Sequence, residues 1–174
     1  MIDYTKIEST LNLLSLEYDK ALCDENQQMP ILFSKLAILE LCGWIEVSVD
    51  KVLCDYVDNN VTKEENRKFI KKTIDRNYGF KFDTHLQPLF CSVFGIKNCE
   101  TIFGSLSEQE MASMKTTLGV CAEKRNIAAH KYTEVGITLT YSAPSEVKSY
   151  YQQLKPAFEK IEKAIQNLGD VSEM

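Results

Sequence analysis

The sequence predicts an all-α fold, an up-down bundle of four to five main helices with a short extended or hairpin segment near residues 133–142. Seven Gly and four Pro are few for 174 residues, whereas β-sandwiches and barrels need a turn about every eight to twelve residues. Apolar residues also recur at helical spacing along most of the chain. The length, with 44% hydrophobic and 26% charged residues, is typical of one globular domain, which we place at 1–174.

Two helices are expected in the first third of the chain. Ile7, Leu11 and Leu14 begin an apolar stripe with helical spacing, which predicts a helix over residues 3–23. From residue 30 to residue 57, apolar side chains surround nearly the whole helix, and a solvated surface helix does not tolerate this. The second helix should therefore be the most buried element, or one that is shared with a partner.

Capping-box patterns in the sequence predict where the next helices begin. A Thr-Lys-Glu-Glu box at 62–65 predicts a helix that runs to about residue 78. The same logic at 83–87 predicts a short helix that Gly95 ends. A Ser-Glu-Gln-Glu box at 107–110 opens a helix that runs to about His130.

The pattern changes between residues 131 and 142, where apolar residues alternate with smaller or polar ones as in a half-buried strand. A single strand lacks a pairing partner, so this segment is a loop, half of a hairpin or an edge that pairs with another molecule. Ser145 is then expected to cap a last helix, which keeps its apolar stripe until Gly169.

Composition excludes several classes of function. The net charge of −5 argues against a protein that binds duplex nucleic acid over its whole surface. The six cysteines form no Cys-x-x-Cys pair, which favours a reduced, cytoplasmic protein over a zinc protein. No apolar run reaches the roughly 18 residues that a spanning helix needs. We therefore expect no metal, no cofactor and no membrane association.

The chain has two histidines, and they differ in setting. His85 lies in a Phe-rich helix start and reads as structural. His130 closes a helical segment in which Arg125 lies five positions earlier, a spacing that separates the two side chains by about 140° on a helix. They can border one cleft if the helix frays at its end or if a second copy supplies half of the site.

An arginine beside a reactive histidine suits phosphodiester cleavage. The guanidinium binds a phosphate in a fork and stabilises the charge that grows on its non-bridging oxygens, while the imidazole moves the proton. RNA carries its own nucleophile, the 2′-hydroxyl, so such a site needs no metal. The alternative interpretation is that Arg125 and His130 make ordinary surface contacts at a helix end.

The string Arg-Asn-Ile-Ala-Ala-His at 125–130 resembles the R-x(4–6)-H motif of the HEPN superfamily, small all-helical proteins that include metal-independent endoribonucleases. The apolar helix around 39–47, with its acidic residue, is similar to the corresponding family helix. The helix and glycine at 89–96 resemble the segment that precedes the motif helix in the RiboL-PSP-like branch. The similarity spans about residues 31–132.

The resemblance implies a bundle that dimerises, so that two motif helices face each other across a shared RNA-cleaving groove. It implies a toxin or defence effector that an antitoxin or another regulatory protein holds in check. Arg125 and His130 would be catalytic, and Asn126 would position them or the phosphate. The family's acidic residue, which would support the arginine, matches three positions: Glu46, which we favour, Glu40 and Asp50.

The third predicted helix is locally basic, with four more positive than negative charges between residues 63 and 81. Such a face attracts phosphate and gives salt-sensitive binding, although charged helix faces also serve only solvation. Together with the lysines that flank the motif, it supplies the RNA-binding candidates: Arg67, Lys71, Lys72, Lys124 and Lys131.

Two other functions remain in competition with the nuclease. A noncatalytic helical interaction module could use the same scaffold to bind a protein partner or a nucleotide, with Arg125 and His130 serving only the interface. A phosphatase or other phosphoryl-transfer enzyme is disfavoured, because the sequence has neither a glycine-rich phosphate loop nor an Asp-x-Asp metal pair.

Overall fold

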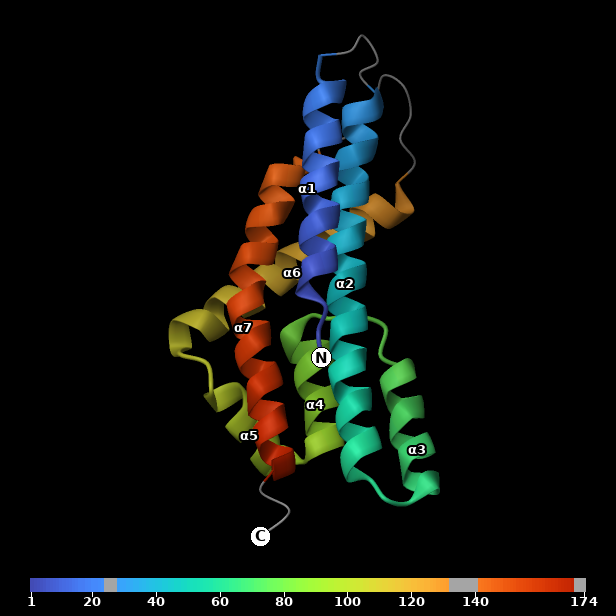
Figure 1. Cartoon of the computed structure of the whole chain (residues 1–174), viewed down its shortest axis with the longest axis vertical. Helices are drawn as coiled ribbons and strands as arrows, with labels where there is room; N and C mark the ends of the chain where they lie inside the picture. Colours follow the sequence, from blue (N-terminus) through green and yellow to red (C-terminus); the bar gives the residue numbers. More distant parts are fainter. Residues whose placement is uncertain (24–27, 132–140, 171–174) are drawn as a thin grey trace.

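The computed structural model describes residues 1–23, 28–131 and 141–170, and it confirms an all-α fold (Figure 1). The longer helices are α1 (Tyr4–Ala21), α2 (Gln28–Asn60), α3 (Glu64–Asp75), α6 (Glu108–His130) and α7 (Pro144–Asp170). A π-helical turn, η1 (Phe82–Leu86), leads into the short helices α4 (Gln87–Phe94) and α5 (Ile96–Gly104). No β-strand occurs in the described ranges.

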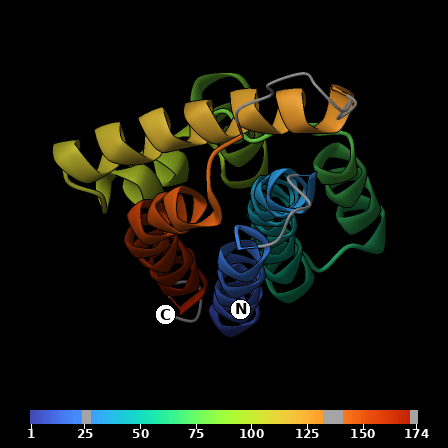
Figure 2. The same ribbon diagram turned by 90° about the horizontal axis from the view of Figure 1, so that it is seen from above.

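The three helices α1, α2 and α7 lie side by side along the long axis of the molecule (Figure 1). Helix α6 crosses this layer and packs on both α2 and α7, as the view from above shows (Figure 2). Helix α3 folds back beside the second half of α2, and α4 and α5 complete that end of the bundle. The motif helix α6 is therefore held by two other long helices.

Helix α2 runs through the middle of the hydrophobic core, as its sequence predicts. Its buried residues include Leu41, Ile45 and Leu53, each with essentially no exposed surface. One stripe of the same helix remains exposed, with Leu32, Leu36 and Val47 at spacings that place them on one side. The second helix is thus largely buried but keeps an uncovered apolar stripe.

The beginning of the chain is fixed by hydrogen bonds to distant helices. Asp3 caps α1 by accepting a hydrogen bond from the backbone N–H of Lys6 at 3.0 Å. The backbone N–H of Ile2 donates to the buried carboxylate of Glu162 on α7 at 2.7 Å. Nearby, the indole of Trp44 packs against the rings of three other aromatic residues: Tyr4, Tyr151 and Phe158. These contacts join α1, α2 and α7.

Three of the expected caps are wrong. Lys63, not Thr62, is the N-cap of α3, and its side chain makes no capping hydrogen bond. Helix α3 also ends at Asp75, before the expected residue 78. At 83–87 the backbone forms the π-helical turn, and α4 continues from it without a side-chain cap. Ser145 lies inside α7, which begins at Pro144. The observed starts differ from the expected ones by one or two residues, which is the usual variation at helix ends.

Other local predictions are confirmed. The Ser107 hydroxyl accepts a hydrogen bond from the Glu110 backbone N–H, and the Glu110 carboxylate accepts one from the Ser107 backbone N–H. Gly95, with φ +77°, ends α4 in a conformation that favours glycine. Helix α5 follows at once and was not predicted. Most of the segment at 133–142 lies outside the described residues, and Tyr141 and Ser142 are in neither helix nor strand.

The cysteines are free among the described residues, and Cys42, Cys99 and Cys121 are buried as small apolar side chains. The Sγ atoms of Cys91 and Cys99 are only 3.0 Å apart, across the junction of α4 and α5. Within the part of the chain that the structure describes, no helix is both long and apolar enough to cross a membrane.

Candidate functional site

The candidate site lies in the last two turns of α6. The Ser107 capping box fixes the start of this helix, and the acidic residues Glu108 and Glu110 in its first turn complement the helix dipole. The other end is regular up to His130, because the backbone N–H of Lys131 still donates to the carbonyl of Ile127 at 3.0 Å. All of the motif residues are therefore helical, and the helix does not fray before His130.

Arg125 points from α6 towards α2 and is held there. Its Nη2 donates to Oε1 of Glu46 at 3.0 Å, and the guanidinium carbon lies 5.8 Å from the centre of the Phe80 ring. Only 29% of the Arg125 side chain and 40% of the Glu46 side chain are exposed. The buried Nε–H of Arg125 has no hydrogen-bond partner among the described residues. The guanidinium is thus fixed at two sides and retains an unused donor.

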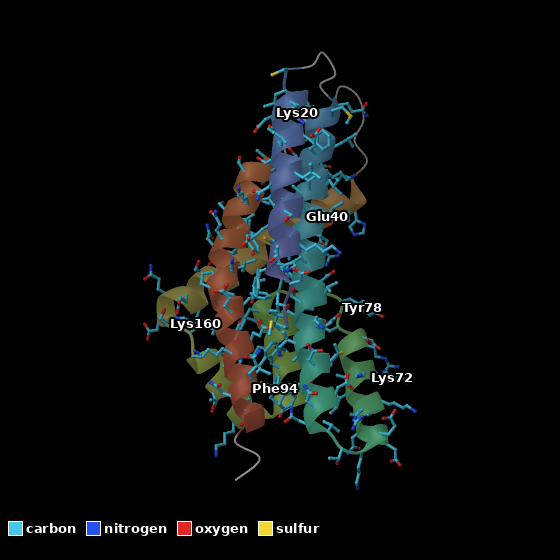
Figure 3. The ribbon with its side chains drawn as sticks, viewed as in Figure 1. Lys20, Glu40, Lys72, Tyr78, Phe94 and Lys160 are labelled. Atoms are coloured by element: carbon cyan, nitrogen blue, oxygen red, sulfur yellow. The ribbon has the colours of Figure 1, made fainter. Side chains whose placement is uncertain are left out.

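The structure distinguishes between the three acidic candidates. Glu46 is the residue that contacts Arg125. Glu40 lies in the groove between α1 and α2, together with Lys6 and Trp44, and Figure 3 shows it on α2. Asp50 lies one turn after Glu46 on α2.

Asp50 has an unusual environment of its own. Burial, and then the negative charges of Asp75 and Glu46, raise its pKa from 3.8 to about 6. A carboxyl group with such a pKa exchanges protons close to neutral pH. Sequence reasoning named Asp50 only as an alternative partner for Arg125, because its approach to Asp75 depends on how α3 folds back on α2.

His130 and Asn126 lie on the exposed side of α6, one turn apart. Neither side chain makes a hydrogen bond or ion pair with another described residue. Ile127, between them, is also exposed, whereas Ala128 is buried. Arg125 and His130 therefore face different surroundings in one copy of the chain: the arginine contacts α2 and the histidine faces outwards.

The basic candidates divide into paired and unpaired side chains. Lys124 lies 3.5 Å from a carboxylate oxygen of Glu146, and Lys71 lies 2.6 Å from one of Asp58. Arg67 donates to the carbonyl of Val61 and lies near Glu64. In the described ranges, the ammonium groups of Lys72 and Lys131 have no acidic partner. These two lysines are the ones whose charge is available to a ligand.

Two aromatic side chains between α3 and η1 or on α3 itself bear on the site. Phe80 is buried and lies beside the Arg125 guanidinium. Its sequence position favours core packing over base stacking, and its burial agrees with that expectation. Phe69 is the aromatic residue that sequence reasoning missed. Phe69 of α3 is 74% exposed; its place in a strongly polar helix was a signal that could have found it. Across the described ranges, no group of three or more His, Cys, Asp or Glu side chains is arranged to hold a metal ion.

The chain was compared with protein-family models, with curated proteins and with solved structures, and none of them matched.

Proposed function

We propose that the chain is a metal-independent endoribonuclease of the HEPN type that works as a homodimer. His130 takes the proton from a 2′-hydroxyl, whose oxygen then attacks the adjacent phosphorus. Arg125 binds the phosphate and stabilises the charge on its non-bridging oxygens. The bond to the 5′-oxygen breaks, an imidazolium of the site protonates that oxygen, and the products carry a 2′,3′-cyclic phosphate and a 5′-hydroxyl.

The observation that carries the proposal is the contrast between the two motif side chains. Arg125 is fixed by Glu46, and 29% of its side chain remains exposed, so part of the oriented guanidinium is accessible to an anion. His130 is exposed and has no partner among the described residues, so its imidazole is available to move a proton. A phosphoryl-transfer site requires both preorganised charge and a free acid–base group, and in this proposal a second copy of the chain brings the two together.

A second copy would complete the site in this proposal. Asn126, Ile127 and His130 form an exposed strip at the end of α6 along which a second copy could pack. Two α6 helices that meet along this strip would bring both histidines to one groove. Asn126 would then orient the phosphate or the imidazole from the same strip.

Cleavage of single-stranded RNA by the purified chain, with chelator present, tests the proposal. The expected products have cyclic phosphate and 5′-hydroxyl ends, and both His130→Ala and Arg125→Ala should lower the rate by at least about a hundredfold. His85→Gln is the matched control, because it removes the only other imidazole in the chain. It should leave the rate unchanged. Loss of cleavage in chelator, or equal rates in all variants, would contradict the assignment.

Expression in cells tests the toxin or defence role. Growth should stop when the wild-type chain is expressed and continue with folded His130→Ala, while His85→Gln should behave like the wild type. If all three arrest growth equally, the effect does not come from cleavage.

The noncatalytic interaction module remains the second candidate, and one observation favours it. The exposed apolar stripe of α2, with Leu36 and Val47, is a surface that a protein partner could cover. Under this alternative, substitutions in the stripe would abolish the cellular effect, whereas His130→Ala would not.

A further inference from the structure

Helix α3 has two chemically different sides. On its inner side, Ile74 is buried against α2 and α4. Its outer side carries Phe69 and Lys72, and the C-cap Arg76, which keeps a helical backbone conformation, continues that side; the spacing places the three within about 60° of one another. Tyr78 is the third residue after the end of the helix. We name these four residues the outer face of α3.

The outer face exposes two aromatic rings to water. Phe69 is 74% exposed and Tyr78 is 83% exposed, and these are the two aromatic side chains among the large exposed apolar residues of the described ranges. Figure 3 shows Tyr78 and Lys72 on the side of the molecule that α3 forms, away from α1 and α7. Rings exposed to this extent have a free face on which a planar ligand can stack.

The basic residues on the two sides of α3 differ in whether they have acidic partners. The inner cations Arg67 and Lys71 lie near Glu64 and Asp58. In the described part of the chain, Lys72 and Arg76 have no acidic partner, so their charge is available. The outer face therefore offers unpaired cations beside exposed rings, although the chain as a whole is acidic.

The outer face leads directly to the candidate site. Tyr78 is two residues before Phe80, so their Cα atoms are at most about 7 Å apart. Phe80 lies beside the guanidinium of Arg125, and the Lys81 ammonium lies 3.9 Å from a carboxylate oxygen of Glu123 on α6. A strand bound along α3 would thus reach Arg125 at the Tyr78 end of the face.

We propose that the outer face of α3 binds single-stranded RNA and guides it to Arg125. Unpaired bases stack on Phe69 and Tyr78, and phosphates contact Lys72 and Arg76. Bases in a duplex are already stacked on one another, so the face selects for single strands. The inference rests on the proposed nuclease function and names the substrate class of that site.

Binding can be measured separately from cleavage with the full chain carrying His130→Ala. The probe is a fluorescently labelled uridine-rich RNA of about 15 nucleotides, compared with a blunt RNA duplex of the same length by anisotropy. We expect the single strand to bind at least about tenfold more tightly than the duplex. Phe69→Ala and Tyr78→Ala should each weaken single-strand binding by about tenfold, because one stacked base is lost.

Substitutions of the basic residues should change how binding depends on salt concentration. Lys72→Gln and Arg76→Gln should each reduce the slope of log affinity against log salt concentration by about 0.7, the value for one phosphate contact on a single strand. The matched controls are Leu13→Ala, an exposed apolar residue on α1, and Lys163→Gln, an exposed lysine on α7. Neither control should change affinity or slope.

Defined outcomes separate this proposal from the nuclease proposal. If the wild-type chain does not cleave RNA but Phe69 and Tyr78 still govern single-strand binding, the outer face stands and the nuclease proposal fails. If cleavage occurs, yet the double variant Phe69→Ala, Tyr78→Ala has unchanged affinity and KM, the outer face does not bind RNA. Equal affinity for duplex and single strand overturns it as well, and points to another partner for these rings.

Discussion

Removing either partner of the Arg125–Glu46 ion pair should lower the free energy of unfolding. Removing both should cost less than the sum of the two single losses. The 3.0 Å separation gives an attraction of about 1.4 kcal/mol at the dielectric constant of water and about 5.5 kcal/mol at an effective value of 20. Most of this attraction is offset, because both groups are partly removed from water. We expect a net coupling of about 1.5 kcal/mol, above the range of exposed pairs and below that of fully buried ones.

The coupling is measured with a double-mutant cycle. Urea unfolding is followed for the wild type, Glu46→Ala, Arg125→Ala and the double variant, and the coupling is the part of the two losses that does not add. Glu17 and Lys20 provide a matched cycle, because they form a short ion pair on the exposed side of α1. That pair should couple by no more than about 0.5 kcal/mol. A coupling between Arg125 and Glu46 below that of the control would refute the preorganised guanidinium.

The same variants connect stability to the proposed chemistry. In the proposed reaction Glu46 would act on RNA only through Arg125, which makes it a positioning residue. Glu46→Ala should raise KM and lower kcat, because the guanidinium loses its orientation, and Glu46→Gln should restore part of both by keeping a hydrogen-bond acceptor. Equal rates for Glu46→Ala and the wild type would show that Arg125 needs no such support.

Three further predictions concern other parts of the molecule. Asp50→Asn should stabilise the chain by about 1 kcal/mol at pH 7.5, because the raised pKa of Asp50 means that folding disfavours its ionised carboxylate. The difference in unfolding free energy between the variant and the wild type should shrink as the pH falls through 6 and vanish near pH 4. Urea unfolding at each pH measures this difference. Ser107→Ala should reduce the free energy of unfolding by about 1 kcal/mol through loss of the α6 cap, whereas Ser107→Asp should not. A mild thiol oxidant should form a disulfide between Cys91 and Cys99, because their sulfur atoms are in contact. The intact mass of the chain should then fall by the mass of two hydrogens. If a Cys91→Ser variant shows the same loss of mass, this pairing is wrong.

The long helices could be predicted because each carries a continuous apolar stripe. The stripe that begins with Ile7 and Leu11 placed α1 to within about two residues of its observed ends. The uninterrupted apolar run of α2 predicted its burial for the same reason. A stripe repeated over many turns averages out local exceptions, so these predictions do not depend on any single residue.

Helix α5 could not be predicted in this way. It is short and contains Asn98, Glu100 and Thr101, and its contribution to the core rests mainly on Ile102 and Phe103. Two or three buried residues do not define a helical period, and packing on α4 and α7 stabilises the helix instead.

The candidate site likewise has a part that the sequence predicts and a part that depends on how the helices pack. The motif from Arg125 to His130 could be found because it is local, but the choice of Glu46 over Glu40 and Asp50 required the crossing of α2 and α6. The five-residue spacing has a physical consequence as well. It turns the two side chains about 140° apart, so one contacts the neighbouring helix while the other faces outwards. In a regular helix with this spacing, the guanidinium contacts a neighbouring helix of the same chain, whereas the imidazole is left exposed for contact with a second molecule. The proposed reaction therefore needs another copy of α6.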